Sequence, residues 1–508
     1  MIVAYFNKNV RIRDFICIFA LYFTPVFKLL FCMTNFPEEQ ILKRMVVDNP
    51  WWSNGAIFND FDFMKPRMFL NPFIDLITSL PKGRSVILLG PRRVGKTVMM
   101  FHSIKTLLAS GVAPRKILYI TVDAPLYSGM SLEDMVDNLL KASKSDGSED
   151  GYYVYFDEIQ YLKDWERHLK VLCDSRRHIR FIASGSAAAA LKMKSLESGA
   201  GRFTQFSLPP LLFCEYLAMI NEEDLIVPCN VEWFGKTTPG YDAVDIYKLN
   251  NRFIDYINFG GYPEVVFSMQ LRNNQGRYIK EDIVDKVLLK DLPGLYGIND
   301  SRDLYRLFIH IVFRSGEEFS YDDLSKESGI RKETLRKYID YLESAFLIRV
   351  VHKIDENSRR FQRVTTFKIY VTNPSVFAAV FSPLSQTDAA FNHLVETAVF
   401  CQLDANSDEL YYSNWKKGRT SGEVDFVRLN RITQKPDRVV EVKWSDRYYR
   451  QPSELKSLLT FMETNHLQQA VVTSIIDTGT RSLDCGQLQF VPTALYAYAK
   501  GIEYVKQA

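Results

Sequence analysis

Hydrophobic and polar positions alternate along residues 85–208 in a way that separates strands from helices. Short runs of branched aliphatic and aromatic residues, typical of strands buried on both faces, are divided by longer segments with apolar residues at helical spacing. The runs occupy residues 86–89, 116–123, 152–156, 179–183 and 203–208. Helical spacing is clearest over residues 130–142. The pattern predicts an α/β domain built on a parallel sheet.

The pattern becomes mostly helical over residues 214–288. Gly260-Gly261-Tyr262-Pro263 interrupts it, because glycine accepts positive φ and proline favours a turn. Before the first strand, residues 69–80 also have helical spacing and are expected to pack against the α/β domain. We therefore predict a helical lid or linker that follows the α/β domain.

Residues 321–351 carry a third arrangement. A short helix ends at Gly329, and a second helix over residues 331–344 has one apolar face. Strands are expected at residues 346–352 and 367–371. The other face of the second helix carries the basic residues Lys332, Arg336 and Lys337. This order is typical of a winged helix, which either sets a basic helix in a DNA groove or serves as a packing or protein-contact module.

Composition narrows the class of protein. A length of 508 residues suggests two to four domains. A hydrophobic share of 47% with 24% charged residues argues against both disorder and a polytopic membrane protein. The net charge of +3 is nearly neutral, so any binding of nucleic acid must come from local patches. Seven cysteines without a CxxC pair indicate small buried side chains in a reducing compartment.

The N-terminal segment allows two interpretations. Residues 15–33 are apolar apart from Lys28 and are just long enough to span a bilayer as a signal anchor. Alternatively, Met33 begins the working protein and the preceding residues are an upstream extension. We favour the extension, and hence a cytoplasmic protein with no stable membrane partner.

The strongest local motif follows the first strand. Residues 90–97 read G-x-x-x-x-G-K-T between a buried strand and an apolar helix, which is the context that a phosphate-binding loop requires. Backbone N–H groups would surround the phosphates of ATP, Lys96 would reach the β- and γ-phosphates, and Thr97 would ligate Mg²⁺. The residues expected to contact ATP here are Gly90, Pro91, Arg92, Arg93, Val94, Gly95, Lys96, Thr97 and Val98. The alternative, a glycine-rich turn in an unrelated fold, is disfavoured by these flanks.

Two adjacent acids follow the third strand. Asp157 would hold Mg²⁺, directly or through water, and Glu158 would polarise the water that attacks the γ-phosphate. A pair of solvated acids at a strand end is the alternative. The phosphate-binding loop about sixty residues earlier favours the catalytic interpretation.

Two further positions are candidates for sensing the γ-phosphate. Ser184 lies in the turn after the fourth strand and would touch this phosphate or the attacking water, unless it only forms the turn. Arg202 precedes the fifth strand and is a candidate arginine finger that stabilises transition-state charge. A solvated arginine is the alternative for Arg202.

Six motifs occur together and in order. They are GPRRVGKT, YVYFDEIQ, ASGS, GRF, PPLLFCEYL and GGYPEV. This set resembles a large, mostly uncharacterised group of bacterial and archaeal AAA-type P-loop ATPases. The resemblance covers roughly residues 36–500, strengthens the assignment of Arg202, and implies a winged helix followed by a C-terminal restriction-endonuclease-like domain. It implies no single biological role.

The C-terminal region contains a second constellation of charged residues. One predicted strand carries Asp425, and a second predicted strand carries Glu441 and Lys443. A predicted helix over residues 392–403 carries Glu396. Residues two apart share a face of a strand, so Glu441 and Lys443 project together. Carboxylates there would bind a divalent metal, and the lysine would orient water. This looks like the PD-(D/E)xK nuclease pattern, whose members either cleave DNA or keep only the fold.

The predicted fold class is α/β, with five parts. They are an N-terminal apolar extension (1–35), a P-loop AAA-type ATPase domain with a parallel sheet (36–225), a helical lid or linker (226–312), a winged helix-turn-helix (313–372) and a PD-(D/E)xK-like α/β domain (373–508). The predicted function is Mg²⁺-dependent ATP hydrolysis whose nucleotide state controls a DNA-engaging C-terminal half. A homo-oligomer would let Arg202 act on a neighbouring subunit. The alternatives are an ATP-regulated, metal-dependent DNA nuclease and an ATP-binding switch that does not hydrolyse ATP.

Overall fold

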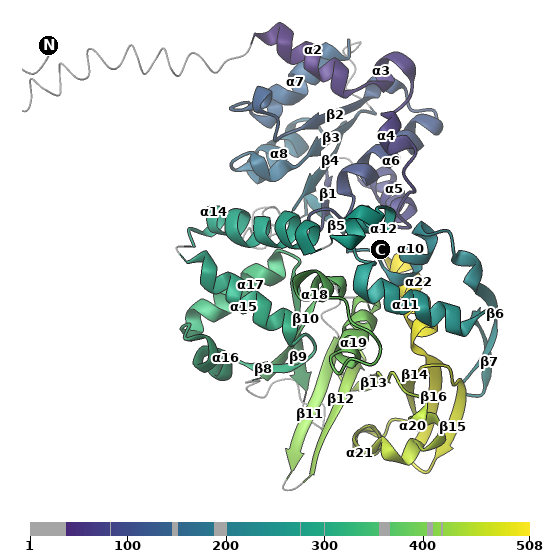
Figure 1. The fold of residues 1–508 in the computed structure, drawn as a ribbon. Helices are drawn as coiled ribbons and strands as arrows, with labels where there is room; N and C mark the ends of the chain where they lie inside the picture. The colour runs from purple at the N-terminus through teal and green to yellow at the C-terminus, as the bar shows by residue number, and fades with distance from the viewer. Residues whose placement is uncertain are drawn as a thin grey trace, which may run out of the picture.

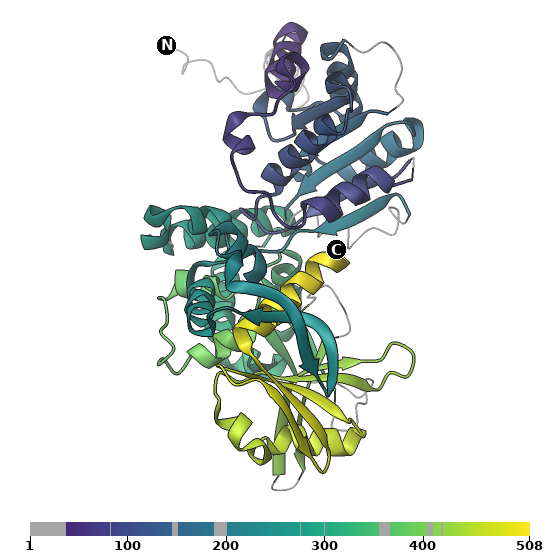
Figure 2. The same cartoon turned by 90° about the vertical axis from the view of Figure 1, so that its right-hand side faces the viewer.

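The computed structural model of this chain has two lobes (Figure 1). The residues that it describes are 37–81, 83–144, 151–186, 201–274, 276–298, 300–354, 366–403, 410–417 and 420–508. The N-terminal lobe is an α/β layer, the C-terminal lobe is built on a long sheet, and helices lie between them (Figures 1 and 2). The last helix, α22 (Thr493–Gln507), runs back from the C-terminal lobe to the junction.

The N-terminal lobe confirms the predicted parallel sheet. Its five strands have the order β2-β3-β4-β1-β5, and every neighbouring pair is parallel. The strands are β1 (Ser85–Leu89), β2 (Ile117–Thr121), β3 (Tyr153–Asp157), β4 (Arg180–Gly185) and β5 (Phe203–Ser207). All residues of β1 and β3 are buried, as expected for strands covered on both faces. The accompanying helices are α2 (Glu38–Asp48), α3 (Trp51–Asn54), α4 (Asn59–Asp62), α5 (Leu70–Ser79), α6 (Lys96–Ala109), α7 (Leu132–Ala142) and α8 (Trp165–Ser175).

A tryptophan pair fixes the first helices to the sheet. The indole N–H groups of Trp51 and Trp52 donate to the carbonyl of Ile117 at 2.9 and 2.8 Å. Both rings are buried. These aromatics therefore pack in the core, and their N–H groups satisfy a backbone acceptor where β2 begins.

The segment between the lobes was predicted to be helical, and this is only partly right. Residues 226–243 form a two-stranded hairpin, β6 (Ile226–Trp233) and β7 (Lys236–Ala243). Phe234 and Gly235 at its tip both have positive φ, +49° and +72°, as a tight two-residue hairpin turn requires. More exposed and less exposed residues alternate along most of β6, as they do in a strand. The prediction of a helix is therefore wrong for this hairpin.

The rest of this segment is helical, and part of it has an unusual winding. Two successive π-helical stretches, η6 (Gly276–Asp285) and η7 (Val287–Asp291), follow the short helices. The α-helices are α10 (Phe213–Met219), α11 (Ile246–Phe259), α12 (Pro263–Phe267), α13 (Met269–Asn273) and α14 (Leu292–Tyr296). π-Helical turns are rare and usually isolated, and they are frequent at functional sites.

Both helices predicted within residues 321–344 are present. They are α16 (Tyr321–Ser328), which ends at Gly329 with φ +73°, and α17 (Lys332–Ser344). The surrounding elements are α15 (Ser301–Phe313), β8 (Glu318–Ser320), β9 (Ile348–Ile354) and β10 (Thr366–Val371). Strand β10 pairs antiparallel with both β9 and β8.

These three strands continue into the C-terminal sheet. Strand β9 pairs parallel with β11, so that nine strands form one sheet of order β15-β16-β14-β13-β12-β11-β9-β10-β8. The boundary predicted between residues 372 and 373 therefore lies within a single sheet. The remaining elements are α18 (Ser375–Val380), α19 (Phe391–Gln402), β11 (Leu410–Lys417), β12 (Thr420–Leu429), β13 (Pro436–Glu441), α20 (Arg447–Arg450), α21 (Lys456–Asn465), β14 (Gln469–Ser474), β15 (Gly479–Leu483) and β16 (Gly486–Pro492).

The predicted N-terminal extension at residues 1–35 lies outside the described residues. Within the described part of the chain, no helix combines the length and the apolar character needed to cross a bilayer.

Candidate functional site

The loop after β1 has the backbone of a phosphate-binding loop. Gly95 has φ +91°, a left-handed conformation that glycine adopts without strain, and helix α6 begins at the next residue. Gly90 passes close to β5, since an added Cβ would lie 2.3 Å from the carbonyl oxygen of Leu208. Both glycines are therefore required, one by conformation and one by the close approach of two backbones.

Lys96 is buried inside this loop. Its Nζ donates to the carbonyl oxygens of Gly90 and Pro91, at 3.1 and 2.8 Å. Burial lowers the pKa of Lys96, against the attraction of the nearby carboxylates of Glu158 and Asp157. The ammonium thus lies among backbone carbonyls that hold it only weakly compared with a phosphate.

Asp157, the last residue of β3, brings the predicted metal ligands together. Its Oδ2 accepts hydrogen bonds from the Thr97 hydroxyl at 2.8 Å and the Tyr119 hydroxyl at 2.9 Å, and its Oδ1 accepts one from Ser184. Asp157 is only 3% exposed. Two oxygen ligands suited to Mg²⁺, from Thr97 and Asp157, therefore face each other across the carboxyl edge of the sheet. The sequence pattern missed Tyr119, because its position within β2 made it look like an ordinary core residue.

Glu158 follows in a left-handed conformation, with φ +55°. Its N–H donates to the Ser184 Oγ at 2.9 Å, so Ser184 contacts both acids of the motif. Four predicted residues, Lys96, Asp157, Glu158 and Ser184, thus gather at one edge of the sheet. Their proximity follows from the topology, since the carboxyl ends of parallel strands meet at the same edge.

A buried ion pair, which the sequence did not reveal, contacts the backbone of the phosphate-binding loop. The guanidinium of Arg67 donates to both carboxylate oxygens of Glu215 at 2.7 Å, to the carbonyl of Val94 at 2.7 Å, and to that of Pro209 at 3.0 Å. The side chain of Arg67 is 4% exposed and that of Glu215 is completely buried. The pair connects the loop to the segment after β5 and to helix α10.

The two arginines of the loop contact the helical segment between the lobes. Arg92 forms a bidentate pair with Asp291 at 2.8 and 2.9 Å, at the end of η7. Arg93 contacts Glu264 at 3.1 Å and Asp282 at 4.0 Å. The side chains of both arginines thus pair with carboxylates of the helical segment, and their predicted contact with ATP stays a prediction.

Arg202 lies away from the phosphate-binding loop of its own chain. Its carbonyl accepts the N–H of Ser85, so it lies beside the amino end of β1, and its guanidinium pairs with Asp174 at 2.7 Å. A strand of five residues separates the two edges of the sheet by about 16 Å. Arg202 and the phosphate-binding loop therefore lie at opposite edges of the sheet within one subunit, and the predicted role of Arg202 toward a neighbouring subunit stays a prediction.

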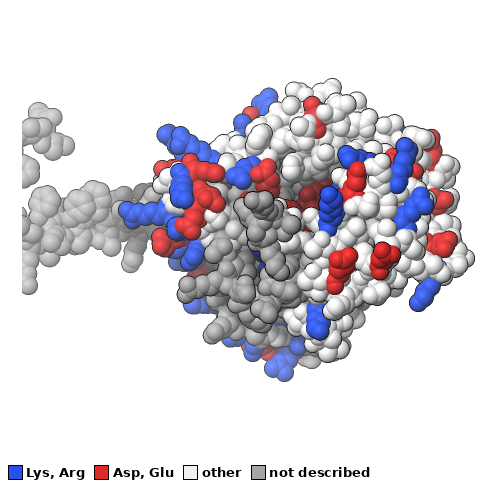
Figure 3. Space-filling model, turned by 90° about the horizontal axis from the view of Figure 1, so that it is seen from below, with Lys and Arg blue, Asp and Glu red and all other residues white. Residues whose placement is uncertain are grey.

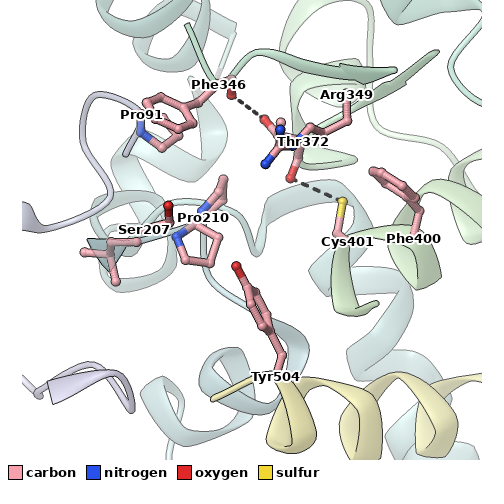
Figure 4. Close-up of a pocket in the computed structure, with 11 residues that line it drawn as sticks. Pro91, Ser207, Pro210, Phe346, Arg349, Thr372, Phe400, Cys401 and Tyr504 are labelled. Carbon is pink, nitrogen blue, oxygen red and sulfur yellow. Dashed lines mark hydrogen bonds between the residues drawn. The ribbon is translucent and has the colours of Figure 1, made fainter. Parts of the chain in front are cut away.

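The loop also borders the C-terminal lobe directly. A small cavity of about 50 Å³ lies between Pro91, the segment after β5 and the C-terminal elements (Figure 4). Figure 4 shows Phe346 beside Pro91 and the Tyr504 side chain pointing toward Pro210. The lining residues are Pro91, Ser207, Leu208, Pro209, Pro210, Phe346, Arg349, Thr372, Phe400, Cys401 and Tyr504. The cavity is mainly apolar and marks the packing interface between the lobes.

The second predicted constellation is also assembled. Lys443 Nζ lies 2.7 Å from Glu441 Oε1 and 3.8 Å from Asp425 Oδ2, and the Val442 N–H donates to that same Asp425 oxygen at 2.7 Å. Burial lowers the pKa of Lys443, but the two carboxylates outweigh burial and hold it above its ordinary value. Burial and the nearby Asp425 raise the pKa of Glu441 to about 7.

These residues line a cavity of about 360 Å³. The Oε2 atom of Glu441 is buried and has no hydrogen-bond partner, and Glu441 as a whole is 6% exposed. The lining residues are Glu423, Asp425, Glu441, Lys443, Tyr448, Glu454, Leu455, Lys456, Ser457 and Leu458. Over the described ranges, no group of three or more His, Cys, Asp or Glu side chains is arranged to hold a metal ion. A metal here would have two protein carboxylates, Asp425 and Glu441, and would need water or substrate oxygens to complete its shell.

A buried lysine, which the sequence did not reveal, pairs with two further carboxylates, those of Glu396 and Glu423. Lys368 on β10 contacts Glu396 at 2.9 Å and Glu423 at 2.6 Å, and its side chain is 2% exposed. The Tyr370 hydroxyl also donates to Glu396, at 2.6 Å. Glu396, expected beside the other acids, is therefore engaged with Lys368 and Tyr370.

Family models match two parts of the chain. Residues 82–217, which contain the phosphate-binding loop and the two acids after β3, match the model of an AAA domain. This part of the chain is therefore similar to an AAA-type P-loop domain. The similarity supports ATP binding by residues 82–217. Residues 250–388 match a domain of unknown function, DUF8612, which spans the π-helical stretches and α15 to α18.

The chain is also similar to proteins from other organisms. It is 22% identical over 362 residues to an uncharacterized protein of Haemophilus influenzae, covering 70% of this chain and 81% of that protein. It is 23% identical over 406 residues to the uncharacterized protein MJ1544 of Methanocaldococcus jannaschii, covering 78% and 83%. The Aeropyrum pernix ORC1 protein, solved in complex with DNA, overlaps 61% of this chain and 91% of its own, at 13% identity and a TM-score of 0.28.

Proposed function

We propose that this protein is a Mg²⁺-dependent ATPase whose nucleotide state controls its C-terminal half. One observation carries the proposal: a single network joins Thr97, Asp157 and Ser184, with Glu158 next in the chain and bonded to the same serine. Hydrolysis of a phosphoanhydride needs a metal-binding oxygen pair, a carboxylate that acts on water and a donor near the γ-phosphate. This network contains one candidate for each.

Each residue has a defined part in this proposal. Lys96 would exchange its two carbonyl partners for phosphate oxygens, which attract an ammonium more strongly. Thr97 and Asp157 would hold Mg²⁺, whose charge offsets that of the phosphates. Glu158 would accept a proton from the attacking water. The Ser184 hydroxyl would contact the γ-phosphate.

The same loop supplies a route from ATP to the helical segment. Phosphates would compete with Asp291 for Arg92 and with Glu264 for Arg93, because one guanidinium cannot serve both partners in full. Binding would then release the end of the π-helical stretch. Since η6 and η7 are π-helical, a small change in the contacts at their ends can shift their winding.

Replacing Asp291 by alanine is expected to loosen the π-helical segment in the absence of ATP. The Arg92–Asp291 pair is charge-assisted and half-buried, and its loss corresponds to about 1.5 kcal/mol, or about tenfold faster amide exchange at residues 276–291. Hydrogen exchange followed by mass spectrometry measures this directly. Glu281→Ala, which removes an exposed pair with Arg277, is the matched control and leaves exchange near wild type. Equal exchange in Asp291→Ala and wild type would contradict this route.

The proposal of hydrolysis is tested by steady-state phosphate release with and without Mg²⁺, and with single- or double-stranded DNA. Turnover that requires Mg²⁺ supports the ATPase. ATP binding without turnover under every condition would support the non-hydrolysing switch instead. Activity that is unchanged by DNA would leave the ATPase intact and remove DNA as its effector.

Binding of DNA by the winged-helix-like part of the chain would depend on the basic residues of α17. Two of its basic residues already have intramolecular partners, since Lys332 pairs with Asp322 and Arg336 lies over the ring of Tyr321 at 5.1 Å. Seen from below, Lys and Arg side chains are interspersed with Asp and Glu side chains over the described part of this face (Figure 3). DNA binding would therefore depend on a few local contacts and be strongly weakened by salt.

A metal-dependent nuclease is the second candidate, and the unpartnered Oε2 of Glu441 favours it. A buried carboxylate oxygen without a donor is costly unless an ion or water completes it. When bound, a divalent cation would polarise a phosphodiester and a water molecule. Asp425 and Glu441 would hold it, and Lys443 would orient the water.

Mn²⁺ binding to the nucleotide-free protein tests this second candidate without relying on activity. Asp425→Asn is expected to weaken Mn²⁺ binding at least tenfold by isothermal titration, because it removes one of two charged ligands. Glu454→Gln, in the wall of the same cavity but paired with Arg447, is the control and keeps wild-type affinity. The same affinity in Asp425→Asn and wild type would contradict the metal site, and no plasmid cleavage with Mg²⁺ or Mn²⁺ would remove the nuclease.

A further inference from the structure

The short 3₁₀ turn after β3 carries a side chain that reaches back to Glu158. This turn, η3 (Ile159–Tyr161), contains Gln160. The Gln160 Nε2 donates to Glu158 Oε2, and the Gln160 Oε1 accepts the N–H of Ser186 at 3.2 Å. Ser186 directly follows β4 and is buried. Gln160 therefore connects the acid that we assign to catalysis with the end of a neighbouring strand.

The orientation of this amide is set by its partners. A backbone N–H can only donate, so the amide oxygen must face Ser186. The amide NH₂ must then face Glu158, whose ionised carboxylate can only accept. A glutamate at position 160 would have the same shape, but it would offer Glu158 no N–H and would place a like charge beside it.

Glu158 is held at two points, one in β4 and one directly after it. Its own N–H donates to Ser184 Oγ at 2.9 Å, and its carboxylate is held through Gln160 by the N–H of Ser186. A residue in a left-handed conformation needs such support, because the surrounding contacts must over-determine it. The two supports come from residues 184 and 186, and contact with a γ-phosphate is proposed for Ser184. A shift of this strand end would therefore move both the backbone and the carboxylate of Glu158.

A further contact links the same turn to the phosphate-binding loop. Tyr161, adjacent to Gln160, lies close enough to the side chain of Arg92 to interact with its charge. Arg92 is the residue that pairs with Asp291 of the π-helical segment. The turn thus touches the loop on one side and carries the support of Glu158 on the other.

We propose that Gln160 is a positioning residue that orients the Glu158 carboxylate for proton transfer from water. The inference rests on the proposed ATPase function and deepens it. Gln160 does not touch the reacting atoms in this scheme. It acts by holding Glu158 in one orientation and by making that orientation depend on the end of β4.

The test compares Gln160→Ala and the isosteric Gln160→Glu with wild type. Both variants are expected to lower kcat about ten- to hundredfold, while the Kd for ATP changes less than twofold, because Gln160 contacts neither the loop glycines nor Lys96. Gln205→Ala, an exposed glutamine on β5, is the matched control and keeps wild-type kcat. Melting temperatures establish that the variants are folded.

A double-variant cycle separates positioning from a merely structural role. In a Glu158→Gln background, Gln160→Ala is expected to cause no further loss of kcat, because the carboxylate that it positions is gone. Additive losses would overturn the inference, as would wild-type kcat in Gln160→Glu. If wild type binds ATP but releases no phosphate, the ATPase proposal fails and this inference fails with it. If wild type is active and Gln160→Ala is equally active, only this inference fails.

Discussion

Replacing Lys96 by alanine is expected to lower the ATP turnover of this protein at least about a hundredfold and to weaken ATP binding at least about tenfold. A preorganised charge inside a buried site typically contributes about a hundred- to a thousandfold to turnover. Lys96 is such a charge, since it is buried among the carbonyls of the phosphate-binding loop and attracted by Glu158 and Asp157. Steady-state phosphate release and titration with a fluorescent ATP analogue measure the two effects.

The matched control for this prediction lies on the same helix. Lys105 is half-exposed and pairs with Asp62, so Lys105→Ala removes one positive charge from α6 without touching the loop. We expect turnover within about twofold of wild type, as for most exposed substitutions. A Lys96→Ala protein that binds and hydrolyses ATP like wild type would refute nucleotide chemistry at this loop.

Breaking the ion pair between Arg67 and Glu215 is expected to cause the largest loss of stability. Removal of one partner leaves a buried charge without compensation, which typically costs about 3–5 kcal/mol. Arg67→Met also removes the donors to the carbonyls of Val94 and Pro209. We expect a loss of at least about 3 kcal/mol in the free energy of unfolding of the N-terminal lobe, measured by urea denaturation, together with weaker ATP binding.

Two further variants are compared with Arg67→Met. Glu38→Gln breaks an exposed pair with Lys141 and is expected to change stability by less than about 0.5 kcal/mol. The double variant Arg67→Met/Glu215→Leu replaces both charges by apolar groups and is expected to regain part of the loss. A single Arg67→Met variant as stable as wild type would contradict the assignment of Arg67 as a support of the loop.

The α/β fold of the N-terminal lobe was largely predictable from sequence because its signals are local. Each strand is a short apolar run that ends in a glycine, an acid or a turn, and the phosphate-binding loop is contiguous. The hairpin at residues 226–243 was missed because its alternation is weak and it contains Pro228 and Pro239. The sequence has a helical period over residues 276–291, but this period does not distinguish π-helical from α-helical winding.

The site was predictable where topology alone brings residues together. Asp157 and Ser184 lie at the carboxyl ends of β3 and β4, Thr97 lies just after the loop that follows β1, and these ends of parallel strands meet at one edge. Arg67 and Glu215 are 148 residues apart, and no sequence pattern connects them. Lys368 is a charged residue within an apolar strand. Its partner Glu396 lies on α19, and only the packing of β10 against α19 brings the two side chains together.

The position of Arg202 shows how topology limits the part that a residue can play. A residue that precedes a parallel strand lies at the amino edge of the sheet, and the phosphate-binding loop lies at the carboxyl edge. Arg202 is therefore limited to a role toward a neighbouring subunit, if the protein assembles so that this edge meets another loop. Turnover that rises with protein concentration in wild type, and is lost in Arg202→Ala, would support such an assembly.

Activation of water by Glu158 is the step on which the proposed hydrolysis depends. Single-turnover phosphate release from ATP–Mg²⁺ is compared between wild type and Glu158→Gln, with ATP binding measured in the same samples. We expect release in wild type, a loss of about a hundredfold or more in Glu158→Gln, and an unchanged Kd for ATP. Equal rates of release in the two proteins would contradict it.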